Sequence, residues 1–289
     1  MSVEQRFEYA TAADPSLNYC LWTYPPPALP EDKLRSVNLL FHSFEHAALN
    51  PDAFAVVEAI RDAIGPFQTV FGVKLIDGKL AWEFYFYDYA RRRRNVSIGR
   101  VLKAISPWMP TSVAPNENLP YFMFSLDLSD AYVSGRVPLD VVHMYVGNPG
   151  STVSSGIAYA VRDNTTVLEN FYFFFDAPSQ LADVAKKVAS SAVFDASALP
   201  IETIIVPELS KCRTICVANK QSHDCIYFSG VNIEQLIWFL EHLRYPIAIV
   251  TFVKRYKGML DHLLFDVGFD YKTHEGGLRI LKSGYYGVF

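Results

Sequence analysis

The alternation of apolar and polar residues is clearest over residues 67–88, on either side of the dipeptide Asp77-Gly78. Asp-Gly is a strong signal for a two-residue turn, because a type I′ turn needs positive φ at both central positions. The turn also sets the register of the two strands, so that Gly72 lies opposite Glu83. These residues therefore predict an antiparallel hairpin.

The two faces of this hairpin differ in chemistry. One face is apolar and aromatic, with Thr69, Phe71, Val73, Leu75, Leu80, Trp82, Phe84 and Phe86. The other face carries a lysine, a glutamate and two tyrosines, among Gln68, Val70, Gly72, Lys74, Ala81, Glu83, Tyr85 and Tyr87. The first face predicts burial under helices. The second face is expected to meet either water or a polar cavity lined by tyrosines.

Helix signals recur between pairs of strand-like segments. A capping residue or a proline precedes an apolar repeat after Asn50, Ser97, Asp176 and Asn232. The expected strand pairs cover residues 121–128 with 139–147, 156–161 with 167–175, 212–218 with 223–229, and 265–271 with 278–288. Strands joined by short turns are antiparallel. The order predicts an α+β fold with antiparallel strands, and it excludes a doubly wound sheet.

Most strand pairs repeat the two-faced pattern, with one apolar side and one side that carries tyrosine and a polar group. A large antiparallel sheet with a solvated face explains this pattern. An antiparallel β-barrel with helices on its outer face and tyrosines in its lumen explains it equally. The residues alone leave both open. In either fold we expect an irregular N-terminal arm over residues 1–35 and a single α+β domain over residues 36–289.

Composition narrows the function classes. The chain has 289 residues, of which 51% are hydrophobic, so it is long enough to bury a large core. The net charge of −4 argues against nucleic acid as a partner. The sequence shows no signal peptide and no apolar run of about 18 residues, so we expect a cytoplasmic protein without a membrane partner.

One motif suggests a metal. Residues 42–46 read His-Ser-Phe-Glu-His, which matches the H-x-x-E-H pattern of inverted zincins. In a helix His42 and His46 share a face, and Glu45 could act as the base for a zinc-bound water. In a strand the two histidines lie about 13 Å apart. No third ligand stands out, so we expect no metal here, with a zinc hydrolase kept as an alternative function.

Three further segments have ordinary interpretations. Cys212, Cys216, His223 and Cys225 resemble a metal set, but strand spacing separates the first two cysteines by about 13 Å. A two-residue turn at Lys220-Gln221 would place Cys216 opposite Cys225, and buried thiols are expected. The run Arg91–Arg94 suggests a phosphate grip and is expected to be a solvated linker. The Gly- and Ser-rich stretch Gly147–Gly156 lacks the Lys-Ser/Thr of a P-loop and predicts a hairpin loop.

The C-terminal part of the chain carries a family resemblance. A strand over Cys225–Ser229, a helix over Asn232–Leu243 and returning strands through Leu263–Phe265 and Gly284–Tyr286 follow one another. This order resembles the αββα-barrel aromatic prenyltransferases, which include soluble bacterial enzymes and cyanobactin peptide prenyltransferases. The resemblance covers roughly residues 36–289. The family repeats its αββα unit five times, and the expected departure is a missing or degenerate helix between residues 128 and 139.

The resemblance implies a barrel that transfers an allyl group from an allyl diphosphate to an aromatic or peptide acceptor. It implies lysine and arginine for the diphosphate, here Lys74 and Arg279, with Lys254 as a further candidate. It implies an acidic residue as base, here Glu83, and tyrosines that shield the allyl cation, here Tyr85, Tyr121, Tyr145, Tyr159, Tyr172, Tyr227 and Tyr285.

The resemblance also bears on cofactors. Members generally need no aspartate-rich magnesium motif, and none is seen in this sequence. We therefore expect no cofactor, with magnesium as the alternative. A non-catalytic module that binds a small molecule or a protein through its tyrosine-lined face is the runner-up function.

Overall fold

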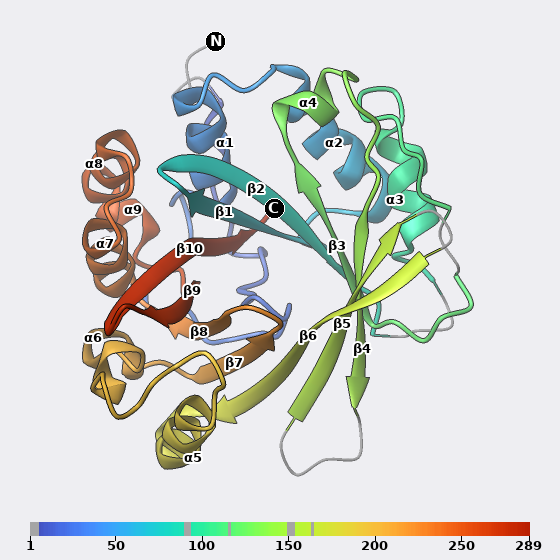
Figure 1. Ribbon diagram of the computed structural model, residues 1–289. Coiled ribbons are helices and arrows are strands. Elements are labelled where there is room, and N and C mark those ends of the chain that lie inside the picture. The colour runs from blue at the N-terminus through green and yellow to red at the C-terminus, as the bar shows by residue number, and fades with distance from the viewer. Residues whose placement is uncertain (1–5, 90–93, 115–116, 149–153, 163–164) are drawn as a thin grey trace.

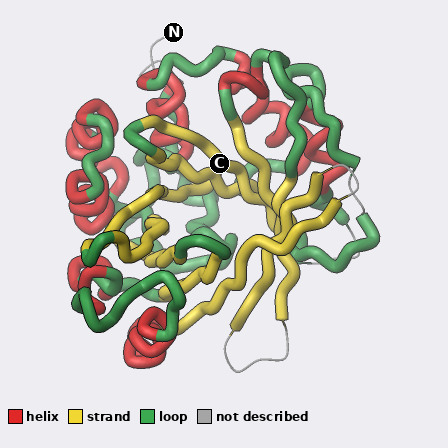
Figure 2. Tube along the Cα trace, viewed as in Figure 1, coloured by secondary structure: helices red, strands yellow, loops and turns green. Residues whose placement is uncertain are grey.

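The computed structural model describes residues 6–89, 94–114, 117–148, 154–162 and 165–289. Ten strands of these residues close into an antiparallel barrel with helices around its outside (Figures 1 and 2). The strands are β1 (Thr69–Ile76), β2 (Lys79–Tyr87), β3 (Met123–Leu128), β4 (Val142–Asn148), β5 (Ser154–Arg162), β6 (Thr165–Asp176), β7 (Thr214–Lys220), β8 (Asp224–Val231), β9 (Phe265–His274) and β10 (Gly277–Val288). The α+β barrel predicted from the sequence is confirmed, and β10 closes it against β1.

The helices of the described residues are α1 (Val37–His46), α2 (Asp52–Ile64), α3 (Ile98–Ile105), α4 (Asp130–Val133), α5 (Ala177–Ala189), α6 (Pro207–Ser210), α7 (Ile233–His242), α8 (Ile247–Arg255) and α9 (Lys257–Leu260). Four of them, α2, α3, α5 and α7, begin where the sequence predicted a helix start. The Ser97 side chain caps α3, and Asn232 forms a capping box with Gln235 at the start of α7. Only the short α4 stands between β3 and β4, where a degenerate helix was expected. No helix in the described ranges is long and apolar enough to cross a membrane.

The apolar face of the first hairpin packs outward against the helices. Phe71, Trp82 and Phe84 belong to the main hydrophobic core together with residues of α1 and α2. The Trp82 indole also donates a hydrogen bond of 2.7 Å to the Ser43 hydroxyl on α1. The opposite face of the hairpin, with Glu83 and Tyr85, lies inside the barrel. The choice between water and a lumen is thereby settled in favour of a lumen.

Glycines on the lumen face make room for the tyrosines. A Cβ atom at Gly72 would lie 2.7 Å from the Tyr286 ring, and one at Gly268 would lie 2.5 Å from the Tyr227 ring. Such distances are well inside van der Waals contact, so a side chain at either position would displace the tyrosine. The pairing of glycine with tyrosine across neighbouring strands therefore fixes where the rings lie.

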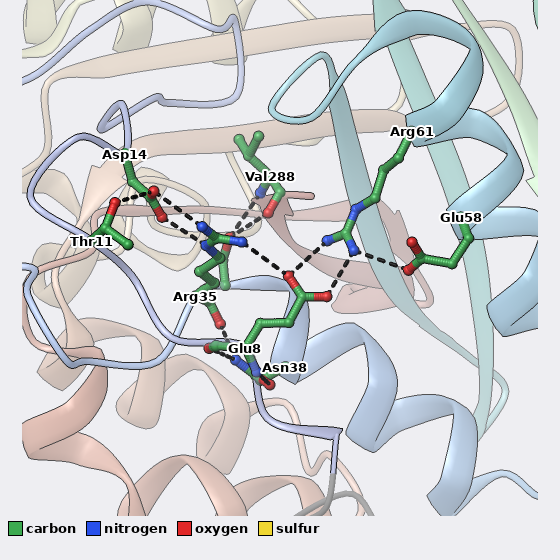
Figure 3. A network of polar contacts seen from close by, with 9 residues as sticks. Glu8, Thr11, Asp14, Arg35, Asn38, Glu58, Arg61 and Val288 are labelled. Carbon is green, nitrogen blue, oxygen red and sulfur yellow. Dashed lines mark hydrogen bonds and ion pairs between the residues drawn. The ribbon is translucent and has the colours of Figure 1, made fainter.

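Ion pairs hold the N-terminal arm together and tie it to helix α2 (Figure 3). Arg35 pairs with Asp14 at 2.6 Å, and Arg61 of α2 pairs with Glu8 at 2.7 Å. Between these anchors and α1 the chain makes a tight loop over residues 18–22. The Asn18 side chain holds this loop by accepting hydrogen bonds of 2.9 Å from the backbone of Cys20 and of Trp22.

Parts of three expected features lie outside the described residues. These are Arg91–Arg93 of the arginine run, residues 149–153 of the Gly- and Ser-rich loop, and the turn residues 163–164 between β5 and β6. Arg94 is described, and it pairs with Asp88 at 2.9 Å while lying 3.6 Å above the Tyr121 ring. This residue therefore binds protein groups in the structure.

Candidate active site

Tyrosine side chains cross the lumen near its middle. We call this set the tyrosine layer; it consists of Tyr85, Tyr145, Tyr172, Tyr227 and Tyr286. Within it the ring centroids of neighbours lie 5.8–6.1 Å apart. From the arm, Tyr19 adds a sixth ring, 5.1 Å from Tyr286 and stacked 6.5 Å from Tyr227. Burial raises the pKa of each of these phenols, so the layer is neutral near pH 7.

On one side of this layer the lumen forms a polar chamber with a volume of about 830 Å³. Its walls carry lysine, histidine, glutamate and aspartate side chains from β1, β2, β3, β4, β6 and β10 and from the β7–β8 hairpin. Its rim includes the exposed residues Val137, Val167 and Gln221, so the chamber opens to solvent. A chamber of this size, with charged walls and an aromatic floor, can hold a small polar ligand.

The first charged group in the chamber centres on Glu83. Its carboxylate accepts hydrogen bonds from Lys74, from the Ser125 hydroxyl and, at 2.7 Å, from the Tyr85 hydroxyl. Burial alone would raise the pKa of Glu83, but the charge of Lys74 offsets burial and holds it well below its usual range. Burial likewise opposes ionisation of Lys74, while Glu83 and Asp127 raise its pKa overall. The two side chains form one buried ion pair.

The second charged group centres on Asp270, which is buried on β9. A single carboxylate oxygen, Oδ2, contacts Lys220 Nζ at 2.8 Å, His223 Nε2 at 3.0 Å and Lys282 Nζ at 3.3 Å. Two lysines on one carboxylate leave a net positive charge. Burial and the neighbouring charges of Lys74 and Lys220 lower the pKa of Lys282. A second anion placed here would therefore relieve repulsion among the lysines.

A histidine and a glutamate form the third group. His143 of β4 contacts the Glu169 carboxylate at 2.7 Å through Nδ1. Burial would lower the pKa of His143, but the hydrogen bond to Glu169 and the charge of Glu83 raise it overall. The same contact lowers the pKa of Glu169 against the effect of burial. This pair can hold or exchange a proton at the chamber wall.

The structure brings together six of the predicted site residues. Lys74 and Glu83 line the polar chamber, and four of the predicted tyrosines, Tyr85, Tyr145, Tyr172 and Tyr227, form most of its floor. The face assignment from the Asp77-Gly78 turn holds because the observed register pairs Gly72 with Glu83.

Three predicted tyrosines lie outside the lumen. Tyr285 belongs to the outer core, because a bulge between Ile280 and Lys282 shifts the alternation in β10 by one residue and places Tyr286 inside instead. A bulge at Ala158/Tyr159 separates Tyr159 from Tyr172 in the same way. Tyr121 precedes β3, and its hydroxyl reaches Glu117 and the backbone of Ile98. Their assignment to the shield was wrong.

Two predicted cations also lie elsewhere. Arg279 lies on β10 before the bulge, opposite Lys272 of β9, and its side chain is exposed. Lys254 lies on α8, outside the barrel, and forms an ion pair with Glu241 of α7. The chamber lysines that sequence reasoning missed are Lys220 and Lys282. Lys220 was missed because it was expected in a turn with Gln221, whereas it is the last residue of β7. Lys282 was missed because the bulge changes the face on which it lies.

The H-x-x-E-H motif lies on helix α1, outside the lumen. His42 stacks on the Phe252 ring at 4.1 Å and contacts the Ala248 carbonyl at 3.2 Å. Among the described residues no group of three or more His, Cys, Asp or Glu side chains is placed to hold a metal ion. The zinc alternative therefore lacks a third ligand in that part of the chain, and the absence of metal binding stays a prediction.

The cysteines do not form the expected pair. Cys216 lies opposite Tyr227 and Cys225 lies opposite Ala218, because the β7–β8 turn lies further along the chain than predicted. Cys212, Cys216 and Cys225 are buried free thiols, as the ordinary interpretation predicted. Burial raises the pKa of all three.

Comparisons with known proteins found similar solved structures but no matching sequence family. No protein-family model matches the sequence, and no curated protein matches it. A solved 6-dimethylallyl tryptophan synthase aligns with 11% identity and a TM-score of 0.51, over 89% of this chain and 97% of its own. A 6-dimethylallyltryptophan synthase from Micromonospora olivasterospora, solved in complex with DMASPP and Trp, aligns with 10% identity and a TM-score of 0.48. That alignment covers 86% of this chain and 95% of the other. The closed ten-strand barrel and the alignment with a TM-score of 0.51 show that the chain has the αββα-barrel fold that its sequence was expected to resemble.

Proposed function

We propose that the chain is a prenyltransferase-like enzyme that binds an allyl diphosphate in the polar chamber. The observation that carries the proposal is the cluster of Lys220, Lys282 and His223 around one oxygen of Asp270. The two lysines carry more positive charge than the single carboxylate that they share can neutralise. The anionic oxygens of a diphosphate would neutralise the remainder and accept hydrogen bonds from these side chains. Lys74 is a weaker candidate for this role, because its charge is already matched by Glu83.

The tyrosine layer fits the other half of such a donor. An allyl diphosphate held at the lysines would direct its hydrocarbon chain toward the aromatic floor, where Tyr172 and Tyr227 border the chamber. As the carbon–oxygen bond breaks, the diphosphate leaves with the electron pair and an allyl cation forms. The π faces of neutral tyrosines stabilise such a cation and exclude water from it.

The acceptor would then supply the electron pair of the new bond and release a proton. Glu83 and His143 both line the chamber and are the candidates to receive that proton. Although burial opposes ionisation, the charge of Lys74 lowers the pKa of Glu83 and keeps the carboxylate ionised, which suits it to orient an N–H or O–H group of the acceptor rather than to take its proton. Against the effect of burial, the hydrogen bond to Glu169 and the charge of Glu83 raise the pKa of His143, so its neutral form is a stronger base than an ordinary imidazole and is the better candidate to remove the proton. An aromatic or peptide acceptor fits this chemistry.

A substitution at Lys282 tests the diphosphate site with little risk to folding, because Asp270 keeps Lys220 and His223 as partners. We expect Lys282→Met to weaken binding of an unreactive thiolo analogue of an allyl diphosphate about 10- to 100-fold. That range corresponds to the loss of one charge-assisted contact of about 1.5–3 kcal/mol. Isothermal titration calorimetry provides the measurement.

The matched control is Lys254→Met, which removes a lysine from the outer surface on α8. It should leave the affinity unchanged. Equal affinity of the Lys282→Met variant and the unmutated protein would reject the assignment of the diphosphate site.

A non-catalytic binding module stays the second candidate, because the three chamber lysines are already in ion pairs in the structure. Such a module would bind a polar ligand in the same chamber without transferring a group. Incubation with an allyl diphosphate and a panel of aromatic and peptide acceptors separates the two. Release of diphosphate with formation of a prenylated product supports the enzyme, whereas binding without either product supports the module.

A further inference from the structure

The lumen holds a second chamber on the other side of the tyrosine layer. Its volume is about 320 Å³, and its walls are mainly aromatic and apolar. The two chambers share Tyr145, Tyr172 and Tyr227, so the same rings form the floor of one and the ceiling of the other. The rim of this lower chamber includes the exposed residues Trp22, Asp176 and Arg213, which shows that it opens at the opposite end of the barrel.

One charged side chain is deeply buried in the wall of the lower chamber. Asp266 of β9 is 4% exposed, and its Oδ2 accepts a hydrogen bond of 2.8 Å from the backbone of Tyr19. Its Oδ1 is buried with no hydrogen-bond partner among the described residues. No Lys, Arg or His of the described part of the chain pairs with it. Burial, only partly offset by hydrogen bonds, raises the pKa of Asp266 to about 7.

A buried carboxyl group without a cation is costly, and a ligand with positive charge would compensate it. The surrounding walls suit such a ligand, because the faces of aromatic rings attract cations. Aromatic rings line this chamber from the arm and from β2, β4, β6 and β8, and include Tyr19, Trp22, Tyr87, Tyr145, Tyr172 and Tyr227. A compact ammonium ion with an apolar body matches both features.

We propose that the lower chamber is a separate binding site for a small hydrophobic amine, whose ammonium group pairs with Asp266. The amine would enter past Trp22 and lie among the aromatic walls. This site is independent of the diphosphate site, because its charged group and its opening both lie on the far side of the tyrosine layer.

The probe is 2-phenylethylamine, compared with 2-phenylethanol, which has nearly the same shape but no charge. At about pH 7.5 calorimetric titration should show the amine binding at least about tenfold more tightly than the alcohol, since a charge-assisted contact contributes about 1.5–3 kcal/mol. Asp266→Asn should abolish the difference. Asparagine can still accept the Tyr19 hydrogen bond, so this variant is expected to fold.

Two further variants test whether the probes bind in the lower chamber. Gly156→Leu should weaken both probes by filling the chamber; a Cβ atom there lies 3.5 Å from the Val146 carbonyl oxygen and 4.0 Å from the Phe122 ring, without a clash. Lys282→Met, in the polar chamber, should change neither. Equal binding of amine and alcohol, no binding of the amine, or an amine preference that survives Asp266→Asn would overturn the proposal. Failure of the diphosphate titration would not affect it.

Discussion

Lys74→Met is expected to lower the free energy of unfolding by about 3–5 kcal/mol, the usual cost of removing one partner from a buried ion pair. The side chains of Lys74 and Glu83 are 8% and 7% exposed, so both charges are largely shielded from water and depend on each other. Without Lys74, the Glu83 carboxylate keeps only the Tyr85 and Ser125 hydroxyls as hydrogen-bond donors. Urea unfolding followed by circular dichroism measures the change.

The double variant Lys74→Met with Glu83→Gln tests the cause of this loss. Glutamine keeps one oxygen that accepts a hydrogen bond from one of the two hydroxyls, its amide nitrogen can donate to the other, and it carries no charge that needs a partner. We expect the double variant to be more stable than Lys74→Met alone, by about 1–3 kcal/mol. If the double variant is less stable than either single variant, the ion-pair account is wrong.

This pair also changes how the proposed roles can be tested. The sequence suggested that Lys74 binds diphosphate while Glu83 acts separately as a base. In the structure a change at either residue disturbs the other, so a loss of binding in Lys74→Ala would not identify a diphosphate contact. Lys282 is the more informative position, because its removal leaves Asp270 with two partners.

The second large effect concerns pH and Asp266. The pKa of its folded-state carboxyl, about 7, lies above the value of about 3.9 expected in the unfolded chain. Between these values the folded protein binds more protons than the unfolded protein. The group therefore costs no stability below about pH 4, destabilises the fold increasingly as the pH rises from about 4 to about 7, and keeps its full cost above that.

Asp266→Asn should remove this pH-dependent cost. We expect the free energy of unfolding of the variant, relative to the unmutated protein, to rise by about 2–3 kcal/mol between pH 5 and pH 8. Urea titrations at several pH values supply the measurement. As a control, Asp183→Asn replaces an exposed aspartate on α5 and should show no such trend. A difference for Asp266→Asn that is constant with pH, or that falls as pH rises, would contradict the assignment.

The first hairpin could be predicted because its register depends on two adjacent residues. Asp77 has φ of 47° and Gly78 has φ of 77°, which is the conformation that the turn prediction needs. Once that turn is fixed, alternation along the strands places Glu83 on the face opposite Trp82 and Phe84, although it does not show whether that face meets water or a lumen. The capped helices were predictable for the same reason, since Ser97 and Asn232 act on residues three positions away.

The last hairpin could not be predicted in the same way. The bulge near Lys282 arises from pairing between β9 and β10, and no local signal in the sequence marks it. A shift of one residue reverses every side chain beyond it, which explains why Tyr286 and not Tyr285 lies in the lumen. One residue could have indicated this change. Gly72 lies on the lumen face of β1, and the space above a glycine is filled by a large side chain on the neighbouring strand, here Tyr286 of β10.

The role of the arm depends on contacts far apart in the sequence. Tyr19 meets Asp266 from 247 residues away, and nothing in the arm itself indicates that this ring enters the barrel. The expectation of an irregular arm gave no indication of the part that the arm plays in the lumen. The division into two chambers therefore emerges only when the arm and the barrel are seen together.

A crystal structure of the protein with an unreactive thiolo allyl diphosphate tests the central claim most directly. We predict that the diphosphate oxygens lie within ion-pair distance, about 4 Å or less, of Lys220 and Lys282, with the allyl chain against Tyr172 and Tyr227. Diphosphate bound outside the polar chamber, or an allyl chain directed away from the tyrosine layer, would contradict the proposed site.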